Sequence, residues 1–190
     1  MTSEKIKETG FAPDDLTDGR EAGEWQTRYD DPIARGAIRN EALYLGGWAA
    51  FSLVFIILVV LELPQYWLGL SGKTLLYFNI CIGAWLAGTL GGTLFAMKWL
   101  YHAVAKNFWN LDRRLWRLFT PHIAGILALV VILIVSSGLF GFFNPETVEK
   151  LHFVISLGFL TGYFSDNAAA KLADIATSIF GKTKGYGGTE

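Results

Sequence analysis

Apolar residues dominate three long stretches of the chain, approximately 43–63, 75–97 and 122–143. Between Leu43 and Met97 only Glu62 and Lys73 carry a charge, and no charged residue lies between Leu118 and Pro145. A helix of about 20 apolar residues crosses the hydrocarbon core of a bilayer, which is about 30 Å thick. The pattern therefore predicts three membrane-spanning helices.

A fourth apolar segment, 151–164, is short for a membrane span because it has only 14 residues. The residues after it, 167–180, carry small and apolar side chains at helical spacing and predict an amphipathic helix. One interpretation is a long tilted fourth helix that crosses the membrane and continues as the amphipathic helix. The other is a re-entrant half-helix that turns back at 161–163.

The number of basic residues alternates from one polar segment to the next, and this alternation helps to decide whether the last segment crosses the membrane. The successive polar segments hold 3, 1, 5, 1 and 3 basic residues, if only Arg28, Arg35 and Arg39, near the first stretch, are counted from the N-terminal tail. Because cytoplasmic loops are enriched in lysine and arginine, this alternation favours four crossings with both termini in the cytoplasm. We expect a bacterial inner (plasma) membrane protein.

The expected fold is an all-α integral membrane protein, a four-helix transmembrane bundle with interfacial amphipathic helices. Residues 1–41 are expected to form a cytoplasmic tail, because residues 1–40 carry nine acidic and six basic side chains interrupted by glycine and proline. The transmembrane domain is predicted over 42–164, and residues 165–190 are predicted to form a cytoplasmic amphipathic helix and tail.

Small residues recur every fourth position in the second apolar stretch, in two adjacent rows on one helix face. In lipid, close backbone contact drives helix association, and small side chains permit it. The pattern predicts tight helix packing but leaves open whether the partner helix belongs to the same chain or to a second copy. The residues are Gly83, Ala84, Ala87, Gly88, Gly91 and Gly92.

Basic and aromatic residues are interleaved between the second and third apolar stretches, over 98–120. Leucines recur there at helical spacing, which predicts an amphipathic helix in the cytoplasmic headgroup layer. Nucleic acid is not expected as a partner, because the apolar stripe is better explained by lipid. The residues expected at the interface or on anionic lipid headgroups are Lys106, Trp109, Arg113, Arg114, Trp116 and Arg117.

Four polar residues lie in or beside the apolar stretches and have two interpretations. They either serve structural roles, such as hydrogen bonds between helices and an interfacial carboxylate, or line a pore in an oligomer. They are Glu62, Asn79, Thr89 and Thr93.

No pattern of catalytic residues is recognisable, so we expect neither enzymatic activity nor a cofactor. None of the three histidines has a nucleophile or metal-ligand spacing beside it, and Cys81 is the only cysteine. The expected function is a non-enzymatic membrane scaffold or sensor subunit, which forms a homo-oligomer or joins a complex through small-residue helix faces and presents its cytoplasmic tails to a partner. The alternative is a homo-oligomeric ion channel or pore-forming effector.

Overall fold

The computed structural model describes residues 27, 29–138 and 145–181, and every regular element in these ranges is a helix. The elements are α1 (Pro32–Val60), α2 (Leu63–Leu68), α3 (Gly72–Ala105), α4 (Arg114–Ser136), the 3-10 turn η1 (Pro145–Glu149), α5 (Leu151–Tyr163) and α6 (Ser165–Phe180). Predictions made for residues 1–26, 28, 139–144 and 182–190 lie outside the described residues.

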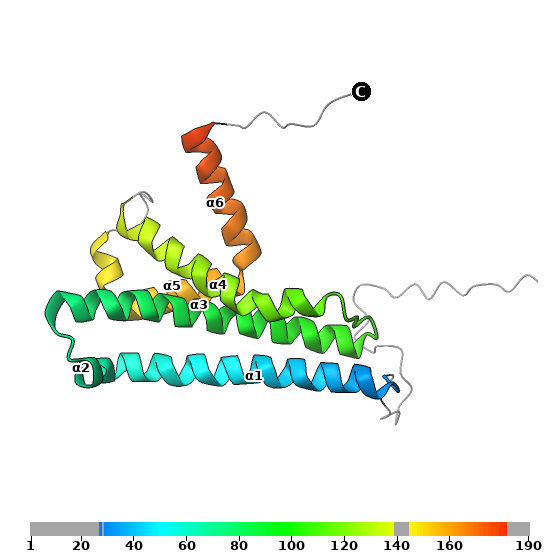
Figure 1. The fold of residues 1–190 in the computed structure, drawn as a ribbon. Coiled ribbons are helices and arrows are strands. Elements are labelled where there is room, and N and C mark those ends of the chain that lie inside the picture. The colour runs from blue at the N-terminus through cyan, green and yellow to red at the C-terminus, as the bar shows by residue number, and fades with distance from the viewer. Residues whose placement is uncertain (1–26, 28, 139–144, 182–190) are drawn as a thin grey trace, which may run out of the picture.

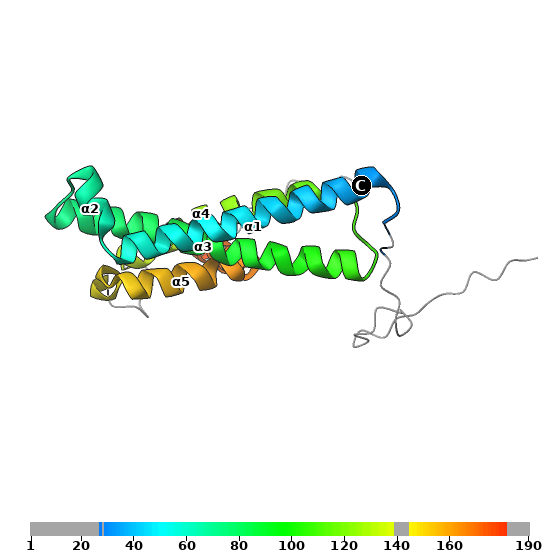
Figure 2. The same cartoon turned by 90° about the horizontal axis from the view of Figure 1, so that it is seen from below.

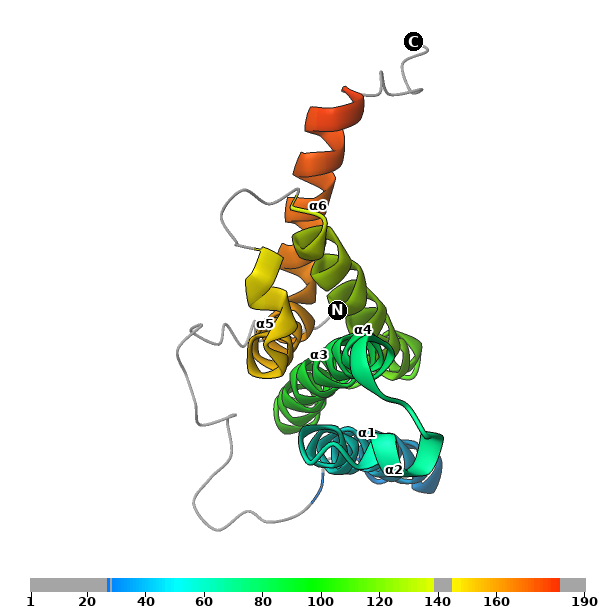
Figure 3. The same cartoon turned by 90° about the vertical axis from the view of Figure 1, so that its left-hand side faces the viewer.

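The central element is α3, and α1, α4 and α5 surround it (Figures 1, 2 and 3). α1 runs antiparallel to α3, since Leu45 packs with Ala96 and Ile56 packs with Leu86. We call the end where α1 begins, α3 ends and α4 begins the basic end, after the five lysines and arginines of α3, α4 and the loop between them, Lys98, Lys106, Arg113, Arg114 and Arg117.

Three of these helices, α1, α3 and α4, are long and apolar enough to cross a membrane. This confirms the three long apolar stretches as helices and is consistent with an integral membrane protein. α5 is apolar but has 13 residues, a length of about 20 Å. A fourth crossing therefore stays a prediction.

The first helix begins well before the predicted span. Asp31 caps α1, because its carboxylate accepts a hydrogen bond from the backbone N–H of Ile33 at 2.9 Å, and Pro32 occupies the first helical turn. Residues 32–41, for which the composition predicts an irregular tail, are therefore helical and extend α1 beyond its apolar stretch.

The amphipathic helix expected within 98–120 is not a separate element. α3 continues to Ala105 and α4 already begins at Arg114, so the segment is divided between two long helices. Pro121 would suit the first turn of a helix that begins with the third apolar stretch, but it lies inside α4. Such prolines are tolerated where neighbouring groups satisfy the freed backbone.

Both small-residue rows of α3 pack against helices of the same chain. A Cβ atom added at Gly88 would lie 2.3 Å from Ala128 Cβ of α4, and one at Gly91 would lie 2.3 Å from the carbonyl oxygen of Phe159 in α5. Gly83 also faces α5, whereas Gly92 faces Ala124 of α4. Of the two alternatives that the sequence left open, the described chain has the intrachain one.

The last apolar segment breaks at Phe164. α5 lies parallel to α3, since Leu151 is beside Gly83 and Tyr163 is beside Gly91. The predicted amphipathic helix is present as α6, but it points away from the bundle instead of continuing α5 (Figures 1 and 3). The face of α3 beyond Gly91 therefore has no partner from α5.

Candidate functional site

A fully buried ion pair joins α1 to α4 at the basic end. The side chains of Glu41 and Arg117 are 0% and 4% exposed. Arg117 donates from Nε to Glu41 Oε1 and from Nη2 to Oε2, the latter at 3.2 Å. A buried charge is tolerated only when it is paired and hydrogen-bonded, so the two residues depend on each other.

The loop before α4 completes this cluster. Trp109 donates its indole N–H to Glu41 Oε2 at 3.1 Å. Its backbone N–H donates to the hydroxyl of Tyr29 at 3.0 Å, and the two rings meet edge to face. Arg35 in turn donates to the carbonyl oxygens of Tyr29 and Asp30, each at 2.8 Å. The chain preceding α1 is therefore fastened to the loop between α3 and α4.

The end of α3 is set by a Schellman motif. Asn107 has a positive φ of 57°, its N–H donates to Val104 O, and the N–H of Phe108 donates to Ala103 O at 3.0 Å. Asparagine tolerates this left-handed conformation better than most residues. The reversal directs the chain back over α3 and brings Phe108 against its last turns.

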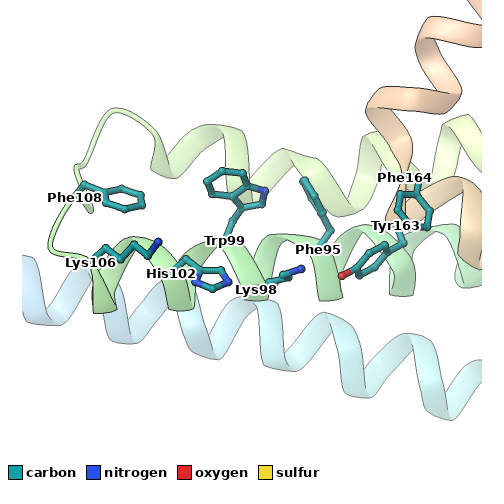
Figure 4. A pocket seen from close by; sticks show the side chains of 8 residues that line it. All are labelled: Phe95, Lys98, Trp99, His102, Lys106, Phe108, Tyr163 and Phe164. Atoms are coloured by element: carbon teal, nitrogen blue, oxygen red, sulfur yellow. The ribbon is translucent and has the colours of Figure 1, made fainter. Parts of the chain in front are cut away.

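A groove with two lobes lies on the surface of this end, and Trp99 and Phe108 belong to both lobes. Figure 4 shows the larger lobe along α3, with Phe108 at one end and Tyr163 and Phe164 at the other. Its volume is about 520 Å³, and its lining residues are Phe95, Lys98, Trp99, His102, Lys106, Phe108, Tyr163 and Phe164. The smaller lobe, of about 340 Å³, is lined by Trp99, Ala103, Phe108, Arg113, Trp116 and Arg117.

Aromatic rings from three helices form the wall of the groove. Phe95 lies at their centre, with its ring centroid 6.3 Å from that of Trp99, 6.0 Å from that of Trp116 and 6.0 Å from that of Tyr163. Edge-to-face contacts of this kind stabilise an aromatic cluster beyond simple burial. The wall is thus a fixed surface shared by α3, α4 and the end of α5.

The charges around the groove all have one sign. Lys98, Lys106 and Arg113 are exposed, whereas the charge of Arg117 is compensated by Glu41. No carboxylate is among the residues that line either lobe. The groove therefore favours anions that also carry an apolar part.

The structure separates the six residues that the sequence predicts for the interface and for anionic lipid. Lys106, Arg113 and Trp116 line the groove, and their interaction with lipid stays a prediction. Trp109 and Arg117 bind Glu41, and Arg117 also lines the smaller lobe. Arg114 is half-buried, and its Nε is buried without a hydrogen-bond partner.

The four candidate pore residues differ in their burial. Asn79, Thr89 and Thr93 are buried within the single chain, and Thr93 donates to the carbonyl oxygen of Thr89 at 2.7 Å. Thr89 faces Gly125 of α4. Glu62 is exposed in the turn between α1 and α2.

A second polar cluster joins α1 to α4 nearer the middle of the bundle. The hydroxyl of Tyr44 lies 2.6 Å from His122 Nε2 and donates to the carbonyl oxygen of Leu118 at 3.2 Å. Trp48 presents its ring edge to His122, with centroids 4.8 Å apart. These bonds orient α1 and α4 at a place where their backbones have few other contacts.

We expect Tyr44→Phe to lower the free energy of unfolding by about 1–2 kcal/mol, because it leaves the half-buried His122 nitrogen without its partner. Chemical unfolding in detergent, followed by tryptophan fluorescence, measures this effect. Tyr77→Phe is the matched control, since Tyr77 is 64% exposed and should be neutral. Equal stabilities of the two variants would show that the Tyr44 hydroxyl does not hold the helices.

Sequence reasoning missed Glu41 because it assigned this residue to the tail. A signal was present: Glu41 continues the helical stripe of Leu45, Ser52 and Ile56, all of which are buried. Lys98, Trp99 and His102 were also left out of the site. The sequence shows that these residues share one helix face, but it does not show whether another helix packs over that face.

The described chain is all-helical, and three of its helices are long and apolar enough to span a membrane. Among the described residues, no group of three or more histidine, cysteine, aspartate or glutamate side chains could hold a metal ion. No protein-family model, curated protein or solved structure matches the chain. The function must therefore be argued from its own residues.

Proposed function

We propose that the chain is a non-enzymatic multi-pass membrane scaffold or sensor subunit with both termini in the cytoplasm. It crosses the membrane four times, assembles through a small-residue helix face and presents its basic end to a partner. The basic alternation along the chain and the three long apolar helices support this membrane placement.

The observation that carries the proposal is an open row of small residues on α1. Ala42, Gly46 and Ala50 are spaced by four along this helix. A Cβ atom added at Gly46 would meet no atom within 4 Å, whereas the glycine rows of α3 are filled by α4 and α5. The row on α1 is therefore free to pack against a second chain, which the rows on α3 are not.

The surroundings of this row are apolar and concave. A groove of about 540 Å³ lies beside it between α1 and α3, lined by Ile38, Ala42, Met97, Leu100, Tyr101, Val104 and Ala105. Only 17% of the most apolar stretch of α1 is buried inside the chain. A helix from another copy would cover side chains that the single chain leaves open.

The basic end suits the presentation of cytoplasmic segments. The contacts of Tyr29 and Arg35 hold the residues just before α1 against the loop between α3 and α4. At this end, the exposed lysines and arginines give a partner an electrostatic surface, while the buried pair keeps the helices that carry them in register.

The substitution Gly46→Leu tests the assembly. We expect the purified wild-type chain to be a dimer or larger oligomer in nanodiscs, and Gly46→Leu to be a folded monomer, because leucine there keeps a second backbone at a distance. Native mass measurement distinguishes the two states. Gly47→Leu is the matched control, because a Cβ atom at Gly47 also meets nothing, and the residue lies about 100° further round the helix.

A wild-type monomer, or a Gly46→Leu variant that assembles as well as Gly47→Leu, would contradict the proposal. The alternative, a homo-oligomeric channel, has less support. Three of its four candidate pore residues are enclosed by helices of one chain and do not face an open surface.

A further inference from the structure

Aromatic and basic side chains share the face of α3 from Phe95 to Lys106, and none of the described helices covers it. α5 ends at Tyr163, beside Gly91, and α6 turns away from the bundle (Figure 1). Large side chains are consequently left in the open: Trp99 is 44% exposed, Phe108 41% and Phe164 52%. Exposed aromatic rings that line a groove offer contact area to the apolar part of a ligand.

Basic side chains and aromatic rings lie in two parallel rows on this face. Lys98, His102 and Lys106 are spaced by four and follow one edge of α3. Phe95 and Trp99 form the neighbouring row, as Figure 4 shows. The groove thus offers positive charge along its rim and apolar surface on its floor, and its lining holds no carboxylate.

The direction of the groove also bears on its ligand. The groove follows the axis of α3, so in a membrane-spanning bundle it runs along the bilayer normal. Aromatic side chains line it from Phe95 and Tyr163 at one end to Phe108 at the other, and Lys98 and Lys106 lie along its rim. A phospholipid has a part for each, with acyl chains for the aromatic surface and a phosphate for the lysines.

We propose that the larger lobe binds one anionic phospholipid from the leaflet at the basic end, an inference that rests on the membrane placement in the proposed function. Lys98 and Lys106 hold the phosphate, because their ammonium groups are exposed and make charge-assisted hydrogen bonds to an anion. The acyl chains lie over Phe95, Trp99 and Phe164. The aromatic floor favours a phospholipid over a free phosphate ester, because the ester has no apolar part to cover that surface.

Native mass spectrometry of the full-length chain in detergent, titrated with phosphatidylglycerol, tests the site. We expect one tightly retained lipid, and we expect Lys98→Gln/Lys106→Gln to weaken its retention about tenfold, equivalent to the loss of one good charge-assisted contact. The control is Lys73→Gln/Lys171→Gln, which removes the same charge at two exposed positions outside the groove. We expect its retention of phosphatidylglycerol to match the wild type.

Two other compounds and one further variant identify the part of the ligand that is recognised. Phosphatidylcholine, which has the same chains but no net charge, should be retained weakly by all variants. Glycerol phosphate in excess, which has the charge but no chains, should not displace the bound lipid. A Trp99→Ser variant should lose phosphatidylglycerol although all its lysines remain.

Three results would overturn the proposal: equal losses in the two double variants, equal retention of the two lipids, or displacement by glycerol phosphate. The oligomer test on Gly46 is independent of these results. A monomeric wild type that retains phosphatidylglycerol through Lys98 and Lys106 refutes the assembly and supports the lipid site. An intact oligomer without selective retention does the reverse, and a chain absent from the membrane fraction refutes both.

Discussion

Replacing Gly162 with alanine should separate α5 from α3 and lower the free energy of unfolding by about 3 kcal/mol, the upper end for an overpacked core. The new Cβ atom would lie 2.1 Å from the carbonyl oxygen of Gly88 and 2.8 Å from its Cα. Both are backbone atoms of the central helix, so no side chain can rotate to make room. The whole of α5 has to move instead.

Gly47→Ala is the matched control for this substitution. It makes the same chemical change inside a helix, but its Cβ atom enters open space. Alanine is the better helix former, so this variant should be more stable by about 0.5–1 kcal/mol. Thermal unfolding in detergent, followed by circular dichroism, measures both variants. Equal transition temperatures would contradict the close approach of α5 to α3.

Removal of one partner from the buried ion pair has the other large expected effect. Glu41→Leu leaves the guanidinium of Arg117 buried without its carboxylate, and we expect a loss of about 3–5 kcal/mol in the free energy of unfolding. The double variant Glu41→Leu/Arg117→Met removes both charges and should recover most of that loss, because apolar residues can replace a buried pair at little cost.

Chemical unfolding of the wild type, both single variants and the double variant gives the coupling energy between the two residues. Lys171→Gln is the control, because it removes one partner of an ion pair whose side chains are 81% and 71% exposed. That change should cost less than about 1 kcal/mol. If Glu41→Leu is as mild as Lys171→Gln, the two charges do not depend on each other.

Hydrophobicity alone predicted the long helices, because an uncharged apolar run that matches the thickness of a bilayer is typical of membrane-spanning helices and rare in soluble domains. It did not predict where they end. α1 begins at Pro32, where a capping aspartate and a proline outweigh the polar composition of the first turns. Likewise, the glycine rows of α3 predicted tight packing, but a row of small residues carries no information about which helix will fill it.

The basic end was harder to predict for a different reason. Charged residues near a membrane usually face water or lipid headgroups, so Arg117 was grouped with Lys106 and Arg113. Only the fold shows that Arg117 meets a carboxylate 76 residues earlier in the chain. The groove could not be predicted either, because it exists where α5 ends and α6 turns away, and no local sequence pattern encodes that change in direction.

The separation of Glu41 and Arg117 along the chain also orders events during synthesis. α1 is complete long before Arg117 leaves the ribosome, so Glu41 has no counterion while the first two long helices are being made. The contacts that bury it require α4 and the loop that carries Trp109. The basic end therefore cannot close before the start of α4 has been made, and a nascent chain that stops before α4 leaves Glu41 without its buried partner.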